Sequence, residues 1–243
     1  MKGRLFVIPG SHPSMAARLM LERKGIAYRR TDLMPVVSRL VLRLQRFPRN
    51  TVPALVLDGC RVQGTKSIAA ALDQLEPEPR LLPEDQDLRA RVDEAEAWAD
   101  TELQDVGRRT LWWVFRRDRA PMASYSQGAR LGIPVDFAVR TGGPLVALGA
   151  RLNGATDERV RAELAKLPAA LDRIDGYIAD GTIGGPEPNV SDYQVATSVR
   201  LLLSLDDLKP LIRDRPAGEH ARRLVPEYPG HVPAGTLPAD WLP

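Results

Sequence analysis

Cysteine is nearly absent from this sequence of 243 residues, and its scarcity removes several kinds of chemistry. Cys60 is the single cysteine, so neither an internal disulfide nor a zinc cluster built from several cysteines can form. The three histidines (His12, His220 and His231) are far apart and lack the spacing of a metal site. We therefore expect no metal centre, and we interpret Cys60 as a structural thiol.

Long apolar runs and a strong excess of one charge are also missing. No stretch reaches the about 18 apolar residues of a membrane span, and the apolar run at residues 5–8 is too short for a signal-peptide core. The net charge is only +3, and basic residues lie close to acidic residues in the sequence, as in residues 89–94. These patterns predict a cytoplasmic protein that binds neither membranes nor nucleic acid.

The first third of the sequence alternates between strand patterns and helix patterns. Short β-branched or aromatic runs predict strands at residues 4–8, 27–32, 51–57 and 60–62. Helical patterns cover residues 11–24, 35–46 and a third segment around 68–75. The pair Asp58-Gly59 is typical of a tight hairpin turn. We interpret residues 1–76 as an α/β domain.

The rest of the sequence reads as helical. Three prolines between Glu76 and Pro83 exclude a helix or a central strand there, so residues 77–84 are interpreted as a linker. Residues 85–225 form a predicted all-α domain, and residues 226–243 a predicted extended, proline-rich tail. The main helices of the all-α domain are expected at residues 85–117, 135–152 with a break near 142–144, 157–179 with a kink at Pro168, and 189–203.

Two motifs carry a family resemblance. The first is Ser11-His12-Pro13-Ser14, followed by a helix that ends in Arg23-Lys24-Gly25-Ile26-Ala27-Tyr28. The second is Leu171-Asp172-Arg173-Ile174-Asp175 followed by Gly184-Gly185-Pro186-Glu187-Pro188-Asn189-Val190-Ser191-Asp192. Together with the element order, they resemble the cytosolic glutathione transferases over nearly the whole chain except the tail. The resemblance implies a thioredoxin-like N-terminal domain, an all-helical C-terminal bundle and a homodimer.

The late motif also has a physical reading of its own. Asn189 is a favourable N-cap residue, and Asp192 is three positions further on, where its carboxylate can accept from the backbone N–H of the cap. We therefore predict a reciprocal cap that begins a buried helix. Its role is structural, and Asp192 is not predicted to be catalytic.

The resemblance implies that Ser11 stabilises a substrate thiolate at the N-terminus of the first helix. A helix N-terminus favours an anion, and a hydroxyl donor there lowers the pKa of a thiol. Ser14 stands where thioredoxin-like redox enzymes have their second cysteine, which excludes disulfide exchange. The alternative for Ser11 and Ser14 is simple helix capping. His12 is either a local acid or base or an exposed turn histidine.

The thiol-binding residues are also inferred from the resemblance. Val52-Pro53 resembles the family's cis-proline site, where the Val52 backbone would hold the cysteinyl part of a peptide thiol. Gly64-Thr65 stands where the family usually has Glu-Ser, so the carboxylate that would pair with the amino group of glutathione is missing. Another low-molecular-weight thiol, such as mycothiol, or a complete loss of thiol binding would fit this departure.

The second substrate of this family lies between the two domains. Trp112, Trp113 and Tyr125 are candidates for the wall of that cleft, and the alternative is that they are core or dimer contacts. We predict an enzyme that conjugates a low-molecular-weight thiol to an electrophilic small molecule, without any other cofactor. The alternative is a non-catalytic protein that uses the same fold as a binding or dimerisation module.

Overall fold

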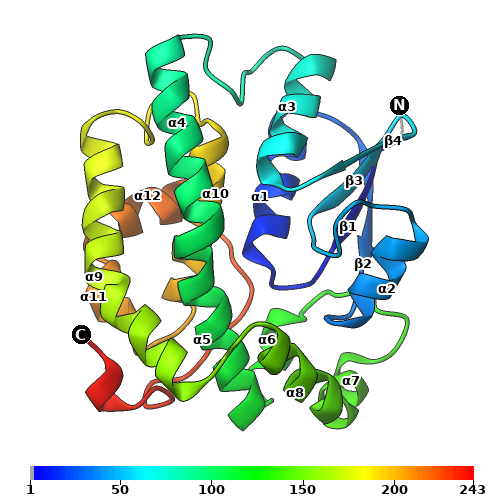
Figure 1. The fold of residues 1–243 in the computed structure, drawn as a ribbon, viewed down its shortest axis with the longest axis vertical. Coiled ribbons are helices and arrows are strands. Elements are labelled where there is room, and N and C mark those ends of the chain that lie inside the picture. Colours follow the sequence, from blue (N-terminus) through cyan, green and yellow to red (C-terminus); the bar gives the residue numbers. More distant parts are fainter. Residues whose placement is uncertain (1–2) are drawn as a thin grey trace.

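The computed structural model describes residues 3–243 and confirms the predicted order of elements in the N-terminal part (Figure 1). Its elements are β1 (Gly3–Val7), α1 (His12–Arg23), β2 (Tyr28–Asp32), α2 (Val37–Leu44), β3 (Ala54–Leu57), β4 (Cys60–Gln63) and α3 (Thr65–Leu75). Met1 and Lys2, the first residues of the predicted domain, lie outside the described residues.

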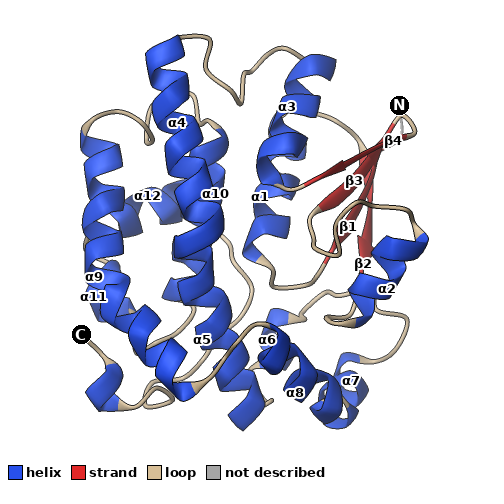
Figure 2. Ribbon diagram, viewed as in Figure 1, coloured by secondary structure: helices blue, strands red, loops and turns tan. Residues whose placement is uncertain are grey.

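A four-stranded mixed sheet organises this part, in the order β2-β1-β3-β4. Strands β1 and β2 are parallel, whereas β3 pairs antiparallel with both β1 and β4. Figure 2 shows α1 and α3 on the side of the sheet that faces the helical part, with α2 on the other side. The arrangement is thioredoxin-like, as predicted.

The regular secondary-structure elements after the linker are all helices, apart from one isolated β-bridge. The helices are α4 (Gln86–Trp98), η1 (Ala99–Leu103), α5 (Gln104–Arg117), α6 (Met122–Tyr125), α7 (Val135–Thr141), α8 (Gly143–Leu152), α9 (Asp157–Ala179), α10 (Val190–Leu203), α11 (Lys209–Ile212), α12 (Pro216–Leu224) and η2 (Ala239–Trp241). The first three follow one another directly, with a π-helical turn where one α-helix was predicted. Helix α9 continues through Pro168. No helix within residues 3–243 is long and apolar enough to cross a bilayer.

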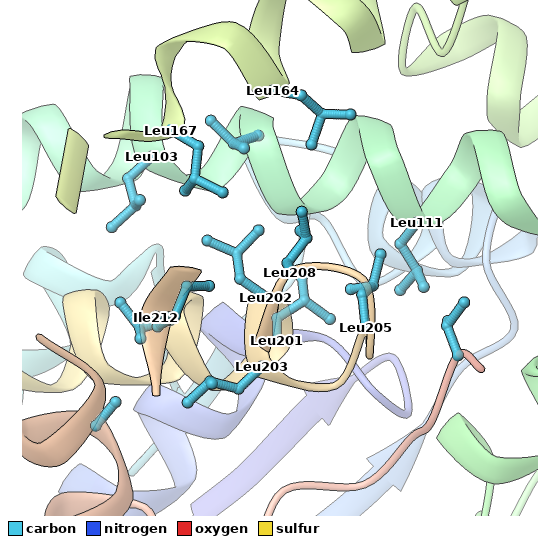
Figure 3. Close-up of a cluster of buried hydrophobic side chains, with 14 of the residues drawn as sticks. Leu103, Leu111, Leu164, Leu167, Leu201, Leu202, Leu203, Leu205, Leu208 and Ile212 are labelled. Carbon is cyan, nitrogen blue, oxygen red and sulfur yellow. The ribbon is translucent and has the colours of Figure 1, made fainter. Parts of the chain in front are cut away.

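The core of the helical part gathers around α10. Figure 3 shows leucines of α5, α9 and α10 meeting in one buried cluster. The predicted reciprocal cap begins α10: the Asn189 side chain accepts from the backbone N–H of Asp192 at 3.3 Å, and the Asp192 carboxylate accepts from the Asn189 N–H at 2.9 Å. The cap lets the helix begin inside the protein without leaving buried N–H groups unpaired.

The N-terminal part and the helical part share one hydrophobic cluster at their interface. Val190 and Tyr193 of α10 and Val92 of α4 belong to the same buried cluster as the α1 and α3 side chains. Lys24, at the end of α1, is buried and pairs with Asp73 at 2.6 Å. That buried pair fixes the second half of the linker, because the Asp73 carboxylate accepts from backbone N–H groups at residues 81 and 82.

The proline-rich tail is packed along the helical part and reaches the N-terminal part. Val232 forms a β-bridge with Leu205, and the ring of Trp241 lies 5.1 Å from that of Trp113. Nearer the start of the tail, the Tyr228 hydroxyl donates to the Gly10 carbonyl at 2.8 Å. The tail therefore holds the turn that follows β1.

Candidate active site

The turn between β1 and α1 presents Ser11 at the start of the helix. Ser11 is the N-cap residue, and its Oγ accepts from the Ser14 N–H at 3.4 Å. Capping uses an oxygen lone pair, so the hydroxyl proton stays available for a ligand. Gly10 precedes it with φ +72°, and a Cβ at Gly10 would lie 2.9 Å from the Tyr125 Cβ. The turn therefore needs glycine both for its backbone conformation and for its close packing.

His12 is buried, which corrects the expectation of an exposed turn histidine. Its side chain is 4% exposed, and its Nε2 has no partner among the described residues. Burial, with a smaller contribution from the charge of Arg108, lowers the pKa of His12 to about 3. The imidazole is therefore neutral at neutral pH and cannot supply positive charge to the site.

Ser14 lines a small cavity of about 60 Å³, which Ser11, Tyr125 and Tyr228 also line. The Ser14 hydroxyl is buried, and its Oγ has no partner among the described residues. Tyr125 is buried too, and its hydroxyl lies 2.5 Å from the Ser204 Oγ. Neither Ser14 nor Tyr125 lines the larger cleft described below.

The peptide bond between Val52 and Pro53 is cis. The preceding loop is held by Gln63 at the end of β4, whose side-chain amide bonds the backbone N–H and C=O of Arg49 at 2.8 Å each and the Thr51 carbonyl at 2.6 Å. Gln63 is 5% exposed. A buried amide with all these partners fixes the backbone around Val52.

Gly64 and Thr65 form the start of α3, which carries no side-chain cap. Thr65 is 2% exposed, and its Oγ1 has no partner among the described residues. A Cβ built at Gly64 would have the Arg49 Nη1 as its nearest neighbour, at 3.8 Å. A guanidinium therefore lies beside position 64, where the resemblance leads one to expect a residue with a carboxylate.

A cleft of about 200 Å³ lies between the two parts of the molecule. Ser11, His12 and Val52 line it from the N-terminal part, and α5 supplies much of the opposite wall. Trp112 is in that wall, with its ring packed on Gly149 of α8, where an added Cβ would lie 2.3 Å from the indole. Gly64 and Thr65 are not among the lining residues.

Trp113 does not line the cleft, contrary to the sequence-based expectation. The structure places it away from the cleft, where its indole N–H donates to Asp157 at 3.0 Å and Arg117 stacks on its ring. Trp113 is one position after Trp112 and so points about 100° away from it around the helix axis, on the side that meets Asp157. Of the three predicted aromatic residues, the structure brings Trp112 alone to this cleft.

Comparison with known proteins agrees with this architecture. Residues 5–80 match the family model described as the N-terminal domain of glutathione S-transferase. Residues 5–80 therefore carry a glutathione S-transferase N-terminal domain, and the chain as a whole has the glutathione S-transferase fold. No curated protein matches it by sequence.

Solved structures with the glutathione S-transferase fold cover almost the whole chain. A glutathione S-transferase from Rhodospirillum rubrum is 21% identical, with a TM-score of 0.59, over 98% of this chain and 97% of that one. A beta-etherase from Sphingobium is 17% identical, with a TM-score of 0.59, over 92% and 99%. A maleylacetoacetate isomerase from Anaeromyxobacter dehalogenans, with glutathione bound in its active site, is 22% identical, with a TM-score of 0.55, over 92% and 89%. At these identities the likeness concerns the fold.

Proposed function

We propose that the protein conjugates a low-molecular-weight thiol to an electrophilic small molecule in the cleft. The observation that carries this proposal is the position of Ser11, which lines the cleft at the N-terminus of α1 with a hydroxyl proton free to donate. In the proposed reaction the thiol loses its proton to water, and the thiolate accepts a hydrogen bond from Ser11. The sulfur electron pair then forms the bond to the electrophilic carbon. The electron pair of the bond that breaks leaves with a displaced group or, in an addition to a double bond, moves to the neighbouring atom, which takes a proton from water.

The α1 dipole and the Ser11 hydroxyl both favour the thiolate over the thiol, which lowers the thiol pKa. His12 lies beside Ser11 but is neutral, so it adds no charge. Val52 pairs with no other backbone group of the described chain, so its N–H and C=O are available to an extended thiol compound. Under this proposal, the backbone positions the thiol and Ser11 stabilises its charge.

The surroundings of α3 favour one chemical class of thiol. Arg49 and the uncapped N-terminus of α3 both attract an anion, and the buried Thr65 hydroxyl can donate to one. No carboxylate stands at position 64 to pair with an ammonium group. We therefore propose a thiol whose end group at α3 is a carboxylate or a neutral polar group. The free α-ammonium of glutathione would make it the weaker ligand.

Thermal unfolding with added thiols tests this proposal. A ligand that binds only the folded protein stabilises it by about 2.7 kcal/mol at a hundred times its dissociation constant. At about 2–4 °C per kcal/mol for a chain of this size, the midpoint should rise by roughly 5–10 °C. We expect a larger shift with an N-acylated thiol than with glutathione.

Ser11→Ala should abolish the conjugation activity and raise the pKa of the bound thiol, measured by its thiolate absorbance. This variant also loses a helix cap, so Thr156→Ala is the matched control. Thr156 caps α9 away from the cleft, with its Oγ1 accepting from the Arg159 N–H at 3.3 Å. Equal activity in the two variants would contradict the role of Ser11.

A binding or dimerisation module remains the second candidate function, and the observation that favours it is Gly64, which has no carboxylate and lies beside the Arg49 guanidinium. Absence of a midpoint shift with every thiol tested would support this candidate over the enzyme. A homodimer, which the family resemblance implies, is part of either proposal, and sedimentation of the purified chain measures it.

A further inference from the structure

The cleft has an unusual charge balance. Its lining residues include two arginines, Arg39 from α2 and Arg108 from α5, and no aspartate or glutamate. Arg39 makes no ion pair within the described residues. Arg108 pairs with Asp105 on its own helix, three residues earlier and outside the cleft lining, and donates to Gln104 at 3.1 Å. Each wall of the cleft therefore presents a guanidinium, and no carboxylate lines the cleft.

Arg108 belongs to a column of cleft residues along α5. Gln104, Arg108 and Trp112 follow at intervals of four, so they lie on one face of the helix, and all three line the cleft. Neighbouring side chains in such a column are about 5–6 Å apart at their Cβ atoms.

The floor of the cleft beneath Arg108 offers a further polar atom. His12 is nine-tenths or more buried, lines the cleft, and has an Nε2 with no partner among the described residues. A buried polar atom without a partner is costly, and a ligand atom is one way to satisfy it. Arg108 is close enough to this imidazole for its charge to influence it.

We propose that the electrophile bound in this cleft is an aromatic or similarly flat apolar molecule that carries a carboxylate. Its carboxylate binds the Arg108 guanidinium, and its apolar part lies against Trp112. Leu111, Phe115 and Leu201 supply further apolar surface there. This inference rests on the proposed function for calling the ligand an electrophile, but its binding can be measured without any reaction.

The test compares phenylacetate with its neutral amide, phenylacetamide, by titration calorimetry and tryptophan fluorescence of the full chain. We expect the carboxylate to bind at least tenfold more tightly, because a charge-assisted hydrogen bond in a partly buried site discriminates by this much. Trp112→Phe should remove the fluorescence response. Equal affinity for the two compounds would overturn the proposal.

Variants assign the preference to Arg108. Arg108→Gln should reduce the affinity ratio to about one, and Arg108→Lys should keep part of it. Arg116→Gln is the matched control, since Arg116 is exposed on the same helix and does not line the cleft. Arg39→Gln should also leave the ratio unchanged. A ratio that survives in Arg108→Gln, or that is lost in Arg39→Gln, would overturn the assignment.

Two outcomes separate this inference from the proposed function. A tenfold preference for phenylacetate, with no thiol-dependent rise in the unfolding midpoint, would support the carboxylate site and contradict the conjugation reaction. A thiol-dependent rise with equal affinity for acid and amide would contradict the carboxylate site alone. If Arg108→Gln fails to fold, the salt dependence of the ratio in the native chain decides, because a charge preference must weaken as salt is added.

Discussion

Two buried titratable groups should oppose each other in the pH dependence of stability. His12 has a pKa lowered from 6.5 to about 3. Glu96 of α4 is 4% exposed, and burial together with the charge of Asp100 raises the pKa of its carboxyl from 4.5 to about 7. Both groups are neutral in the folded protein over the interval in which the unfolded chain would charge them. Their stability contributions therefore change in opposite directions with pH.

The sign follows from counting protons. Between pH 3 and 6.5 the unfolded state binds the His12 proton more readily than the folded state, so stability rises with pH at about 1.4 kcal/mol per unit. Between pH 4.5 and 7 the folded state keeps the Glu96 proton, so stability falls with pH at the same slope. From pH 4.5 to 6.5 the two slopes cancel, and each alone amounts to about 2.7 kcal/mol.

Urea unfolding at several pH values between 4.5 and 6.5 gives the free energy of unfolding of each variant. Subtracting the value of the unmodified chain at the same pH removes the contribution of the other titratable groups. His12→Gln should become less stable by about 2.7 kcal/mol relative to the unmodified chain as pH rises across this interval. Glu96→Gln should gain the same amount, and the double variant should run parallel to the unmodified chain. Parallel profiles for all four proteins would refute the reasoning that both groups are neutral in the folded state.

Two further substitutions test contacts around the cleft. Tyr228→Phe removes the hydrogen bond to the Gly10 carbonyl and should cost about 1 kcal/mol, because a partly buried acceptor loses its partner. The unfolding midpoint and the conjugation rate should both fall. Gly149→Ala places a Cβ 2.3 Å from the Trp112 indole. It should shift the Trp112 fluorescence and weaken phenylacetate binding, since the ring has to move.

Each of these substitutions has a control with the same chemical change. Tyr28→Phe removes an exposed hydrogen bond to Glu22 and should cost less than Tyr228→Phe. Gly176→Ala, in α9, meets no atom within 4 Å and should be neutral or slightly stabilising. A cost in Tyr228→Phe no greater than in Tyr28→Phe would contradict the role given to the tail, and a Trp112 signal unchanged by Gly149→Ala would contradict the packing.

The local elements were predictable because each has a local physical signal. The hairpin at Asp58-Gly59, the reciprocal cap at Asn189 and the helix at residues 157–179 all follow from neighbouring residues. The π-helical turn at Ala99–Leu103 was not predictable, because nothing in its residue pattern differs from an α-helix. Local signals therefore define the elements but not their irregularities.

The candidate site was predictable only where a motif marked it. Ser11, His12 and Val52 were found in this way, and Trp112 through the family resemblance, whereas Gln63, Arg108 and Tyr228 were not among the candidate site residues. Tyr228 contacts a residue 218 positions earlier, and no pattern in the sequence connects the two. Arg108 has one signal in retrospect, the four-residue spacing with Gln104 and Trp112, but several other helical arginines have similar spacings. Long-range packing decides which of them faces the cleft.

The shared core has a consequence for how this protein can be recombined with its relatives. Val190 and Tyr193 of α10 fill the same buried cluster as the side chains of α1 and α3. A chimaera that joins residues 1–76 to the helical half of a different protein with this fold would replace these two side chains with those of the other protein. Successful exchanges should therefore carry α10, and not only the linker, together with the thioredoxin-like part. The smallest part of the chain that can be exchanged as one piece therefore includes α10, although α10 lies well beyond the linker in sequence.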